Sequence, residues 1–372
     1  MKRSIVIIIL TFCYSLSIFA QSEQHGIVAT QATKVDNLFN AYNNINTSGV
    51  SIMVIRDSQV IYNRSFGLAD VEHKVPATPQ TNYRLASVTK QFTAMAIMIL
   101  KDEGRISLDD PLVKFFPNIH SYGKKITIRH MLNHTSGLLN YGDLIPEGTT
   151  IPLTDKDVLH LIEPLDSTDF EPGTKFAYSN TAYSLLSLIV AKVSGMPYKD
   201  FLKQRIFEPL GMTYSIANVM GDSIYNRAYG YDQKADGLKM SDQSIYSYIL
   251  GDGGVYSSVT DLYKWNEALY KPVLVKQETL DEIFTISSKE HEHLGYGYGW
   301  YIDTKYGKKR VSHTGGTSGF STYIIRYPEI KFSVIILANL DEGFTVAKVG
   351  DAIEDIYLKE KELSGSSISF RQ

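Results

Sequence analysis

The chain has 372 residues, of which 44% are hydrophobic and 21% are charged, a composition typical of a globular protein. The formal net charge is −3 and no block of lysine or arginine occurs, so neither a nucleic acid nor an anionic membrane is expected as a main partner. This length is sufficient for one large core with an insertion, or for two lobes.

The first 20 residues have the pattern of a signal peptide. Lys2 and Arg3 precede an apolar run that ends at Ala20, and polar residues follow from Gln21. We therefore expect a cleaved signal peptide at residues 1–20, a linker at 21–31, and a mature protein that is secreted across the inner membrane into the periplasm without stable membrane insertion. Because Ile18 is larger than the residue usual at that position, an uncleaved anchor is the alternative.

The cysteine and histidine content argues against a metal site. The only cysteine, Cys13, lies in the N-terminal segment, so the mature chain would have neither disulfides nor thiolate ligands. His130 and His134 have the spacing of a zinc pair on a helix, but the glutamate of His-Glu-x-x-His is missing and no third ligand is evident. We expect no metal and no organic cofactor.

Hydrophobic patterns predict strands near both ends of the chain and helices in the middle. A helix over 31–44 and a hairpin of strands over 50–55 and 60–66 come first, and strands over 297–302, 309–313, 320–326 and 332–338 precede a last helix over 344–359. Between them, helices are expected over 128–132, 155–162, 181–193, 198–207 and 261–270.

These elements predict an α/β (α+β) fold. One antiparallel β-sheet would form from both ends of the chain and be flanked by helices, with an inserted, mainly helical lobe at about residues 109–289. The single domain would span residues 32–362 and be followed by a tail over 363–372. A catalytic cleft is expected where the sheet meets the helical lobe, because such junctions often hold pockets.

One stretch combines a serine and a lysine at the start of an apolar helix. Ser87 and Lys90 are three residues apart and precede an apolar run that continues to the glycine at position 104. Residues three apart are neighbours on a helix, and the unpaired amides at a helix start favour negative charge. This arrangement suits a serine nucleophile with an amine partner, although an ordinary N-cap serine would have the same spacing.

A second Ser-x-x-Lys match, at Ser121 and Lys124, makes the spacing weak evidence by itself. Gly123 and its polar neighbours predict a loop at that match, in which a spacing of three does not bring two side chains together. Other motifs are needed to choose between the two serines.

Two further motifs follow in the chain. Tyr178-Ser-Asn180 places a phenol and an amide at the start of a predicted helix. His313-Thr-Gly-Gly ends a predicted strand, and its glycines would allow a substrate backbone to approach that strand closely. The sequence His-Thr-Gly occurs only once in the chain.

In this order, the three motifs Ser-x-x-Lys, Tyr-x-Asn and His-Thr-Gly resemble those of the serine β-lactamase and penicillin-binding protein superfamily. The stretches at 132–138, 253–262 and 296–300 look like the same family, and the resemblance spans roughly residues 34–358. Tyrosine in the second motif points to the branch of class C β-lactamases, D-alanyl-D-alanine carboxypeptidases and esterases. His313 replaces the lysine of class C β-lactamases and is similar to the His-Thr-Gly of carboxypeptidases in that branch.

The resemblance implies a role for each motif residue. Ser87 would be the nucleophile, and Lys90, Tyr178 and His313 would complete the catalytic group. The residues expected to bind substrate are Asn180, Thr314, Gly315 and Gly316. Among these, the backbone amides of Ser87 and Gly316 would hold the oxyanion, whereas Asn180 and Thr314 would orient the substrate amide or carboxylate.

The proton acceptor is left open by the sequence. Lys90 could lose its proton through burial and act as the base, or it could stay charged and support Tyr178 as the base. An unperturbed histidine has a pKa of about 6.5, so the charge of His313 is expected to affect activity near neutral pH.

The resulting hypothesis is an exported serine hydrolase that acts through an acyl-enzyme on a D-amino-acid peptide, amide, ester or lactam, and most resembles a D-alanyl-D-alanine carboxypeptidase. Its partner would be a small-molecule or peptide substrate, such as a peptidoglycan stem peptide or a β-lactam. A carboxylesterase or β-lactamase of the same fold is the alternative within enzymes, and a penicillin-binding sensor without turnover is the alternative outside them. The oligomeric state does not follow from the sequence.

Overall fold

A computed structural model of the chain describes residues 30–42 and 46–359. The expected signal peptide, the tail and most of the linker lie outside the described residues. The last two linker positions, 30 and 31, already belong to a helix that continues to residue 38, so the linker is shorter than expected.

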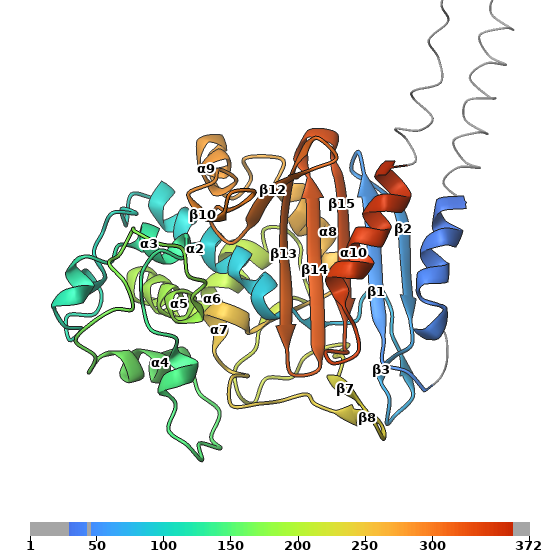
Figure 1. Cartoon of the computed structure of the whole chain (residues 1–372), viewed down its shortest axis with the longest axis horizontal. Helices are drawn as coiled ribbons and strands as arrows, with labels where there is room; N and C mark the ends of the chain where they lie inside the picture. The colour runs from blue at the N-terminus through green and yellow to red at the C-terminus, as the bar shows by residue number, and fades with distance from the viewer. Residues whose placement is uncertain (1–29, 43–45, 360–372) are drawn as a thin grey trace, which may run out of the picture.

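The centre of the molecule is an eight-stranded antiparallel sheet with the strand order β10-β11-β12-β13-β14-β15-β1-β2 (Figure 1). Its strands are β1 (Val50–Arg56), β2 (Gln59–Phe66), β10 (Ser288–His291), β11 (Leu294–Tyr296), β12 (Tyr301–Lys305), β13 (Lys308–Thr317), β14 (Phe320–Tyr327) and β15 (Phe332–Ala338). Strands β1 and β15 pair with Val54 opposite Val334, so the two ends of the chain meet in one sheet as the sequence predicts.

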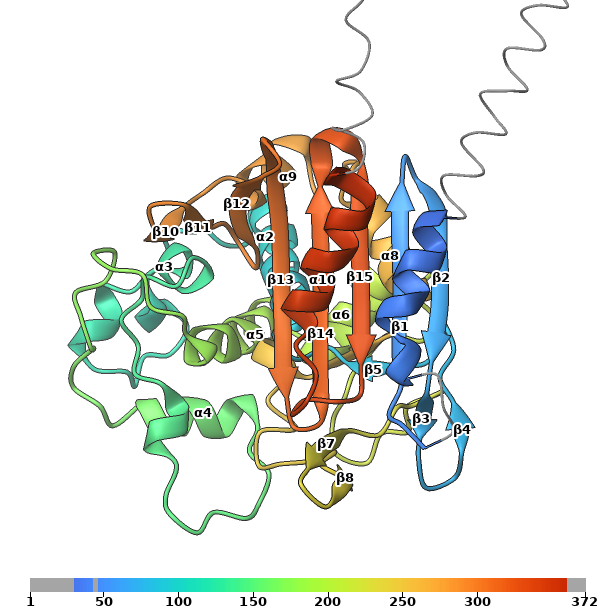
Figure 2. The same ribbon diagram turned by 45° about the vertical axis from the view of Figure 1, so that its right-hand side comes forward.

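Both faces of this sheet are covered by helices. The helix over residues 30–38 and helix α10 (Val346–Glu354), with its π-helical continuation η8 (Asp355–Lys359), lie on one face, whereas α2 (Lys90–Asp102) and α8 (Val259–Ala268) lie behind the other (Figure 2). In β15, Ile335 and Leu337 join the core on the α2 side, and Val334 and Ile336 join the core on the α10 side. Two buried faces explain why this strand reads as one continuous apolar run.

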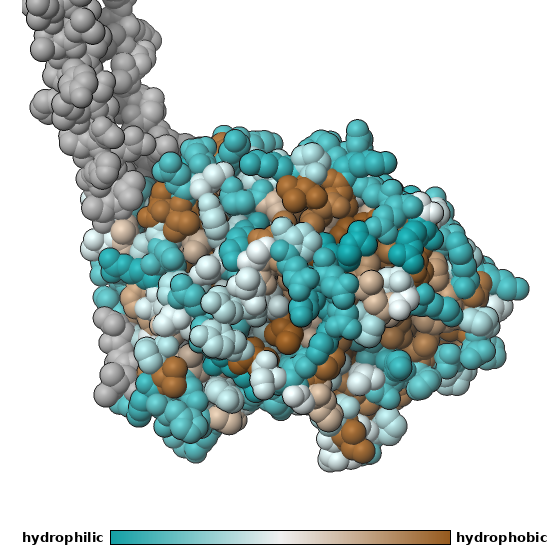
Figure 3. All heavy atoms as spheres, turned by 180° about the vertical axis from the view of Figure 1, so that it is seen from behind, coloured by the Kyte–Doolittle hydropathy of each residue, from teal (hydrophilic) through white to brown (hydrophobic). Residues whose placement is uncertain are grey.

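The middle of the chain forms the expected helical lobe beside the sheet (Figure 1). Its helices are α3 (Ile128–Leu132), α4 (Asp155–Ile162), α5 (Asn180–Ser194), α6 (Tyr198–Leu202), α7 (Leu250–Gly253) and α9 (Gln277–Ile283), and its single turns are η3 (Leu112–Lys114), η4 (Ser121–Lys124), η5 (Tyr141–Leu144) and η6 (Lys203–Phe207). The lobe also holds the short strands β6 (Ile216–Ala217), β7 (Tyr231–Lys234), β8 (Gly237–Met240) and β9 (Val255–Ser257), which the sequence patterns did not predict. On the far side of the molecule, apolar side chains form scattered groups between polar ones (Figure 3).

The turn η1 (Asn40–Tyr42) precedes β1, and η7 (Pro328–Ile330) joins β14 to β15. The connection from the sheet to the lobe carries the remaining elements, which are β3 (Leu68–Asp70), β4 (Val75–Pro76), β5 (Tyr83–Arg84) and η2 (Ala86–Thr89). No helix of the described ranges is both long and apolar enough to cross a membrane.

Two local predictions are wrong. The expected loop at 121–124 is the 3₁₀ turn η4, whose glycine packs against buried apolar side chains. The expected strand over 297–302 is interrupted, because residues 297–300 form a turn between β11 and β12. In that turn Gly299 has a φ of 78°, and a Cβ atom there would lie 2.8 Å from the backbone oxygen of Lys90. Close packing against α2 therefore decides this turn, and a strand pattern does not reveal such a contact.

Strand β13 packs directly against the turn η2, and this contact generates a prediction about two adjacent glycines. A Cβ atom on Gly315 would lie 2.3 Å from the Leu85 oxygen and 2.4 Å from Thr322 Oγ1, whereas one on Gly316 would meet its nearest atom, Asp341 Oδ1, at 3.9 Å. We predict that Gly315→Ala lowers the free energy of unfolding by about 1–3 kcal/mol, the usual cost of overpacking, and that Gly316→Ala lowers it much less. Urea denaturation of both variants measures the difference, and equal effects would contradict it.

Candidate active site

Ser87 is presented by a strained but firmly anchored turn. It lies in η2, between strand β5 and helix α2, and the preceding residue Ala86 has a φ of 48°. A left-handed conformation costs a non-glycine residue of order 1–3 kcal/mol and persists only where the surroundings enforce it. Here the Leu85 amide donates to the Val255 oxygen at 2.8 Å, and Thr322 Oγ1 donates to the Leu85 oxygen at 2.7 Å. Strands on both sides thus hold the residues that precede the serine.

The Lys90 amine is the centre of the site. It is fully buried, and its Nζ lies 3.2 Å from Ser87 Oγ, 2.7 Å from Asn180 Oδ1 and 3.0 Å from the Asp252 backbone oxygen. The last two oxygens can only accept hydrogen bonds. A neutral amine, which has two N–H groups, would therefore donate to both of them and direct its lone pair at the hydroxyl of Ser87.

Burial also allows the Lys90 amine to lose its proton near physiological pH. It lowers the pKa of Lys90 to about 8, because the charged form loses its hydration, and the negative charge of Asp252 opposes this effect only in part. Within the described part of the chain, Lys90 has no carboxylate at ion-pair distance. The geometry and the pKa of Lys90 both suit a general base.

Tyr178 lies close to strand β13, with its ring centre 6.1 Å from that of His313. Although 37% of the residue is exposed, its phenol end points inward beside Ser87, and Lys90 Nζ lies 4.8 Å from its ring centre. Burial of that end raises the pKa of Tyr178 well above its usual value. The phenol is therefore neutral, and it can donate a hydrogen bond to Ser87 Oγ while Lys90 accepts one.

His313 is buried behind the tyrosine rather than open to the pocket. Its Nδ1 lies 2.6 Å from the Thr314 oxygen, which can only accept, so Nδ1 carries the proton and Nε2 accepts from the Tyr296 hydroxyl at 3.1 Å. Burial and the nearby Lys90 lower the pKa of His313 to about 3. The expected titration near neutral pH is thus wrong, because the sequence showed neither the burial nor the adjacent amine.

The two histidines with the spacing of a zinc pair accept hydrogen bonds from backbone amides. His130 Nδ1 accepts from the Thr127 amide at 3.3 Å in the capping box of α3, and His134 Nδ1 accepts from the Ser179 amide at 3.0 Å. Among residues 30–42 and 46–359, no group of three potential metal-binding side chains of His, Cys, Asp or Glu occurs. The ring centres of His134 and Tyr178 are 4.4 Å apart, so His134 also packs against the tyrosine.

A cavity of about 350 Å³ opens in front of Ser87. Three predicted residues line it: Ser87, Asn180 and Gly316. Lys90, Tyr178 and His313 stand behind this surface, and Thr314 and Gly315 are not part of the lining. Thr314 is exposed, and Gly315 packs against Leu85.

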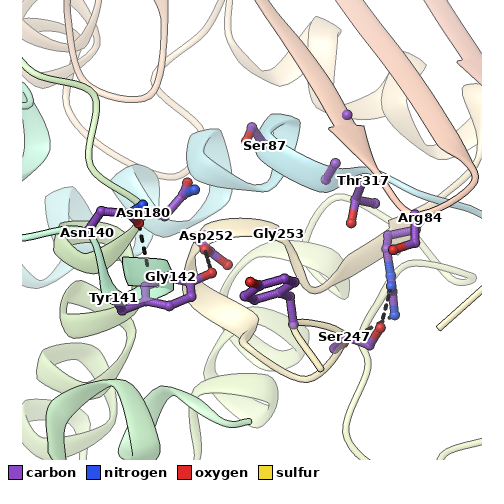
Figure 4. Close-up of a pocket in the computed structure, with 14 residues that line it drawn as sticks. Arg84, Ser87, Asn140, Tyr141, Gly142, Asn180, Ser247, Asp252, Gly253 and Thr317 are labelled. Atoms are coloured by element: carbon purple, nitrogen blue, oxygen red, sulfur yellow. Dashed lines mark hydrogen bonds between the residues drawn. The ribbon is translucent and has the colours of Figure 1, made fainter. Parts of the chain in front are cut away.

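The cavity also has lining residues that the sequence analysis did not assign to the site, including Arg84, Asn140, Tyr141, Tyr246, Asp252 and Thr317 (Figure 4). Asn140 and Tyr246 come from two separate segments of the helical lobe, 140–153 and 215–250. Asp252 immediately precedes the stretch 253–262, which resembles the superfamily. Its place next to that stretch was the signal in the sequence that could have indicated Asp252 as a site residue.

Comparison with known proteins agrees with the fold and with the motifs. A family model described as Beta-lactamase matches residues 35–358. Penicillin-binding protein 4* of Bacillus subtilis is 33% identical over 310 residues, which cover 78% of this chain and 68% of that protein. Several other curated relatives are 30% identical, and the matched part spans 60% of their length.

Solved structures have the same fold. An octameric penicillin-binding protein homologue from Pyrococcus abyssi is 33% identical with a TM-score of 0.76, over 88% of this chain and 77% of that one. A D-stereospecific amidohydrolase from Streptomyces is 26% identical with a TM-score of 0.73, over 88% and 99% of the two chains. The protein is a serine hydrolase of the fold that β-lactamases and penicillin-binding proteins share. It belongs to the β-lactamase family.

The lowered pKa of Lys90 generates a prediction about pH. If neutral Lys90 is the base, kcat/KM for hydrolysis of an activated ester should rise with pH through an apparent pKa of about 8, because the reactive amine is protonated below that value. Lys90→Arg, which stays charged, should lower kcat/KM by about 10²-fold or more at every pH. The rates are measured after subtraction of those of Ser87→Ala.

His313→Gln serves as the matched control for that profile. Because His313 is neutral above a pKa of about 3, its replacement should leave the rise near pH 8 in place. A rise centred between about pH 6 and 7 that disappears in His313→Gln would show instead that the histidine titrates.

Proposed function

We propose that the protein is an exported hydrolase that transfers the acyl group of a D-amino-acid peptide, amide or ester to Ser87 and then to water, most like a D-alanyl-D-alanine carboxypeptidase. The observation that carries this proposal is the position of Lys90 Nζ, which lies within hydrogen-bond distance of both Ser87 Oγ and Asn180 Oδ1. One amine thus links the nucleophile to a side chain that can hold a substrate amide.

In the proposed reaction, Lys90 accepts the proton of the Ser87 hydroxyl as Oγ attacks the substrate carbonyl. The neutral Tyr178 hydroxyl, which lies beside Ser87, would pass a proton to the leaving amine or alkoxide, and Lys90 would return the proton to Tyr178. Water then attacks the acyl-enzyme by the reverse route. This scheme assigns the base to Lys90 and a proton relay to Tyr178, and leaves His313 with a positioning role through its hydrogen bond with Tyr296.

The developing oxyanion would be held by the backbone amides of Ser87 and Gly316. Strand β12 pairs with β13 only as far as Ser312, and β14 covers the opposite edge. The segment after Ser312 therefore has one edge open towards the cavity, where a backbone amide can bind a ligand. Fixed amides at a buried carbonyl are worth about 10²–10³-fold in rate.

The proposed substrate class rests on the chemistry of the cavity and on the relatives. Amide and phenol groups surround the serine, and one similar solved structure is a D-stereospecific amidohydrolase. A panel of D-Ala-D-Ala peptides, D-amino amides, p-nitrophenyl esters and nitrocefin separates the carboxypeptidase from an amidase, an esterase and a β-lactamase.

We predict that Ser87 is acylated. Incubation with a fluorophosphonate or a penicillin should add one adduct, which peptide mass spectrometry should place on Ser87. Among the serines in the described part of the chain, this one alone has its side chain hydrogen-bonded to a lysine amine. Ser121→Ala is the matched control from the second Ser-x-x-Lys and should be labelled like the wild type. Hydrolysis of the whole panel by Ser87→Ala at the wild-type rate would overturn the proposal.

Export generates a separate prediction. If residues 1–20 are a cleaved signal peptide, the mature protein in fractionated bacterial cells should begin at Gln21 and occur in the periplasm. N-terminal sequencing of the purified protein measures this. An intact N-terminus in the membrane fraction would identify an anchor, and full-length protein in the cytoplasm would contradict export.

A further inference from the structure

The cavity contains a buried carboxylate whose side chain the proposed reaction does not use. Asp252 lines the cavity in front of Ser87, and only 7% of the residue is exposed. Its backbone oxygen accepts from Lys90, so the residue is held next to the catalytic amine. In Figure 4 its side chain lies on the same side of the cavity as Asn180 and Tyr141, opposite Arg84.

This carboxylate has a phenol but no cation as its partner. Tyr141, which is neutral because burial and Asp252 raise its pKa, donates to Oδ2 at 2.8 Å. In the described part of the protein, no lysine, arginine or histidine nitrogen forms an ion pair with Asp252. The nearby Asp155 is occupied, since its two oxygens accept the amides of Leu250 and Gly251.

A buried carboxylate without a cation is costly, because it loses hydration and gains only one hydrogen bond in return. Burial accordingly raises the pKa of Asp252, although the charge of Lys90 opposes this effect. A cationic ligand in the cavity would supply the missing partner. Carboxylates accept several hydrogen bonds, and the Tyr141 contact orients this one while leaving acceptor capacity for a ligand.

We propose that Asp252 binds the free α-ammonium group of the substrate, so that the enzyme prefers an unblocked amino-acid amide or N-terminal residue to its N-acylated form. This inference rests on the proposed function and names the substrate class more narrowly.

The arrangement of Ser87, Lys90 and Asp252 limits where the substrate ammonium can lie. Lys90 Nζ is 3.2 Å from Ser87 Oγ and 3.0 Å from the backbone oxygen of Asp252, so the nucleophile and this residue are separated by a single amine. Ser87 and Asp252 also line the same cavity, so a substrate whose ammonium is one carbon away from the attacked carbonyl would present both groups there. The cavity volume of about 350 Å³ also favours a small acyl group.

A paired comparison of substrates tests the inference. D-Alanine p-nitroanilide and its N-acetyl derivative differ at the α-nitrogen alone, and the free amine is mainly protonated at about pH 7. We expect wild-type kcat/KM to favour the free amine by about tenfold or more, and Asp252→Asn to reduce this ratio to near one. A role of Asp252 in setting the pKa of Lys90 alone would change both rates together and leave the ratio intact.

Asp166→Asn is the matched control, because it removes the same charge from an exposed carboxylate that does not line the cavity. It should keep the wild-type ratio. Asp252→Ser is a second neutral replacement if the asparagine variant does not fold. If wild-type kcat/KM for the free amine does not exceed that for the N-acetyl derivative, the inference is overturned whatever the variants show.

Binding without turnover separates this inference from the proposed function. Calorimetry on Ser87→Ala should show tighter binding of D-alaninamide than of N-acetyl-D-alaninamide, and the difference should be lost in Ser87→Ala/Asp252→Asn. Equal binding of the two amides, or no binding of either, would overturn the ammonium site. Hydrolysis that does not require Ser87 would instead overturn the proposed function, whatever the substrate ratio.

Discussion

The site depends on one costly arrangement: the amine of Lys90 is buried in full and has no ion-pair partner in the described structure. Its contacts are neutral oxygens from three separate segments, namely Ser87 of η2, Asn180 of α5 and the backbone of Asp252 in α7. A lysine in such surroundings loses its proton far more easily than one in water. The helical lobe and the connection from the sheet must therefore be packed correctly before Ser87 lies beside Lys90, its proposed base.

Close packing around Ser87 also keeps its hydroxyl near Lys90. Gly315 lets strand β13 approach the backbone of Leu85, and Thr322 and Val255 hold that backbone in place. The left-handed Ala86 is tolerated because its neighbours are fixed on both sides. A serine on a freely moving loop would not keep its hydroxyl within reach of Lys90, so rigidity here is a condition for the proposed chemistry.

Burial, rather than residue type, decides the protonation state of each group in the site. The same loss of hydration lowers the pKa of Lys90 and His313 and raises that of Tyr178. His313 and Tyr178 therefore do not change their protonation state near neutral pH, whereas the pKa of Lys90 lies close to neutral pH. His313 is then a neutral link from the Thr314 backbone to Tyr296.

Local periodicity predicts the sheet made from both chain ends, the helical lobe and most helix positions, and the three ordered motifs favour Ser87 over Ser121 as the nucleophile. The tertiary structure alone decided which groups are buried together. Asp252 and Tyr141 are 111 residues apart, and their hydrogen bond in the cavity has no trace in local pattern. The turn at Gly299 likewise depends on contact with Lys90. Protonation and pocket chemistry arise from such distant contacts, which periodicity cannot encode.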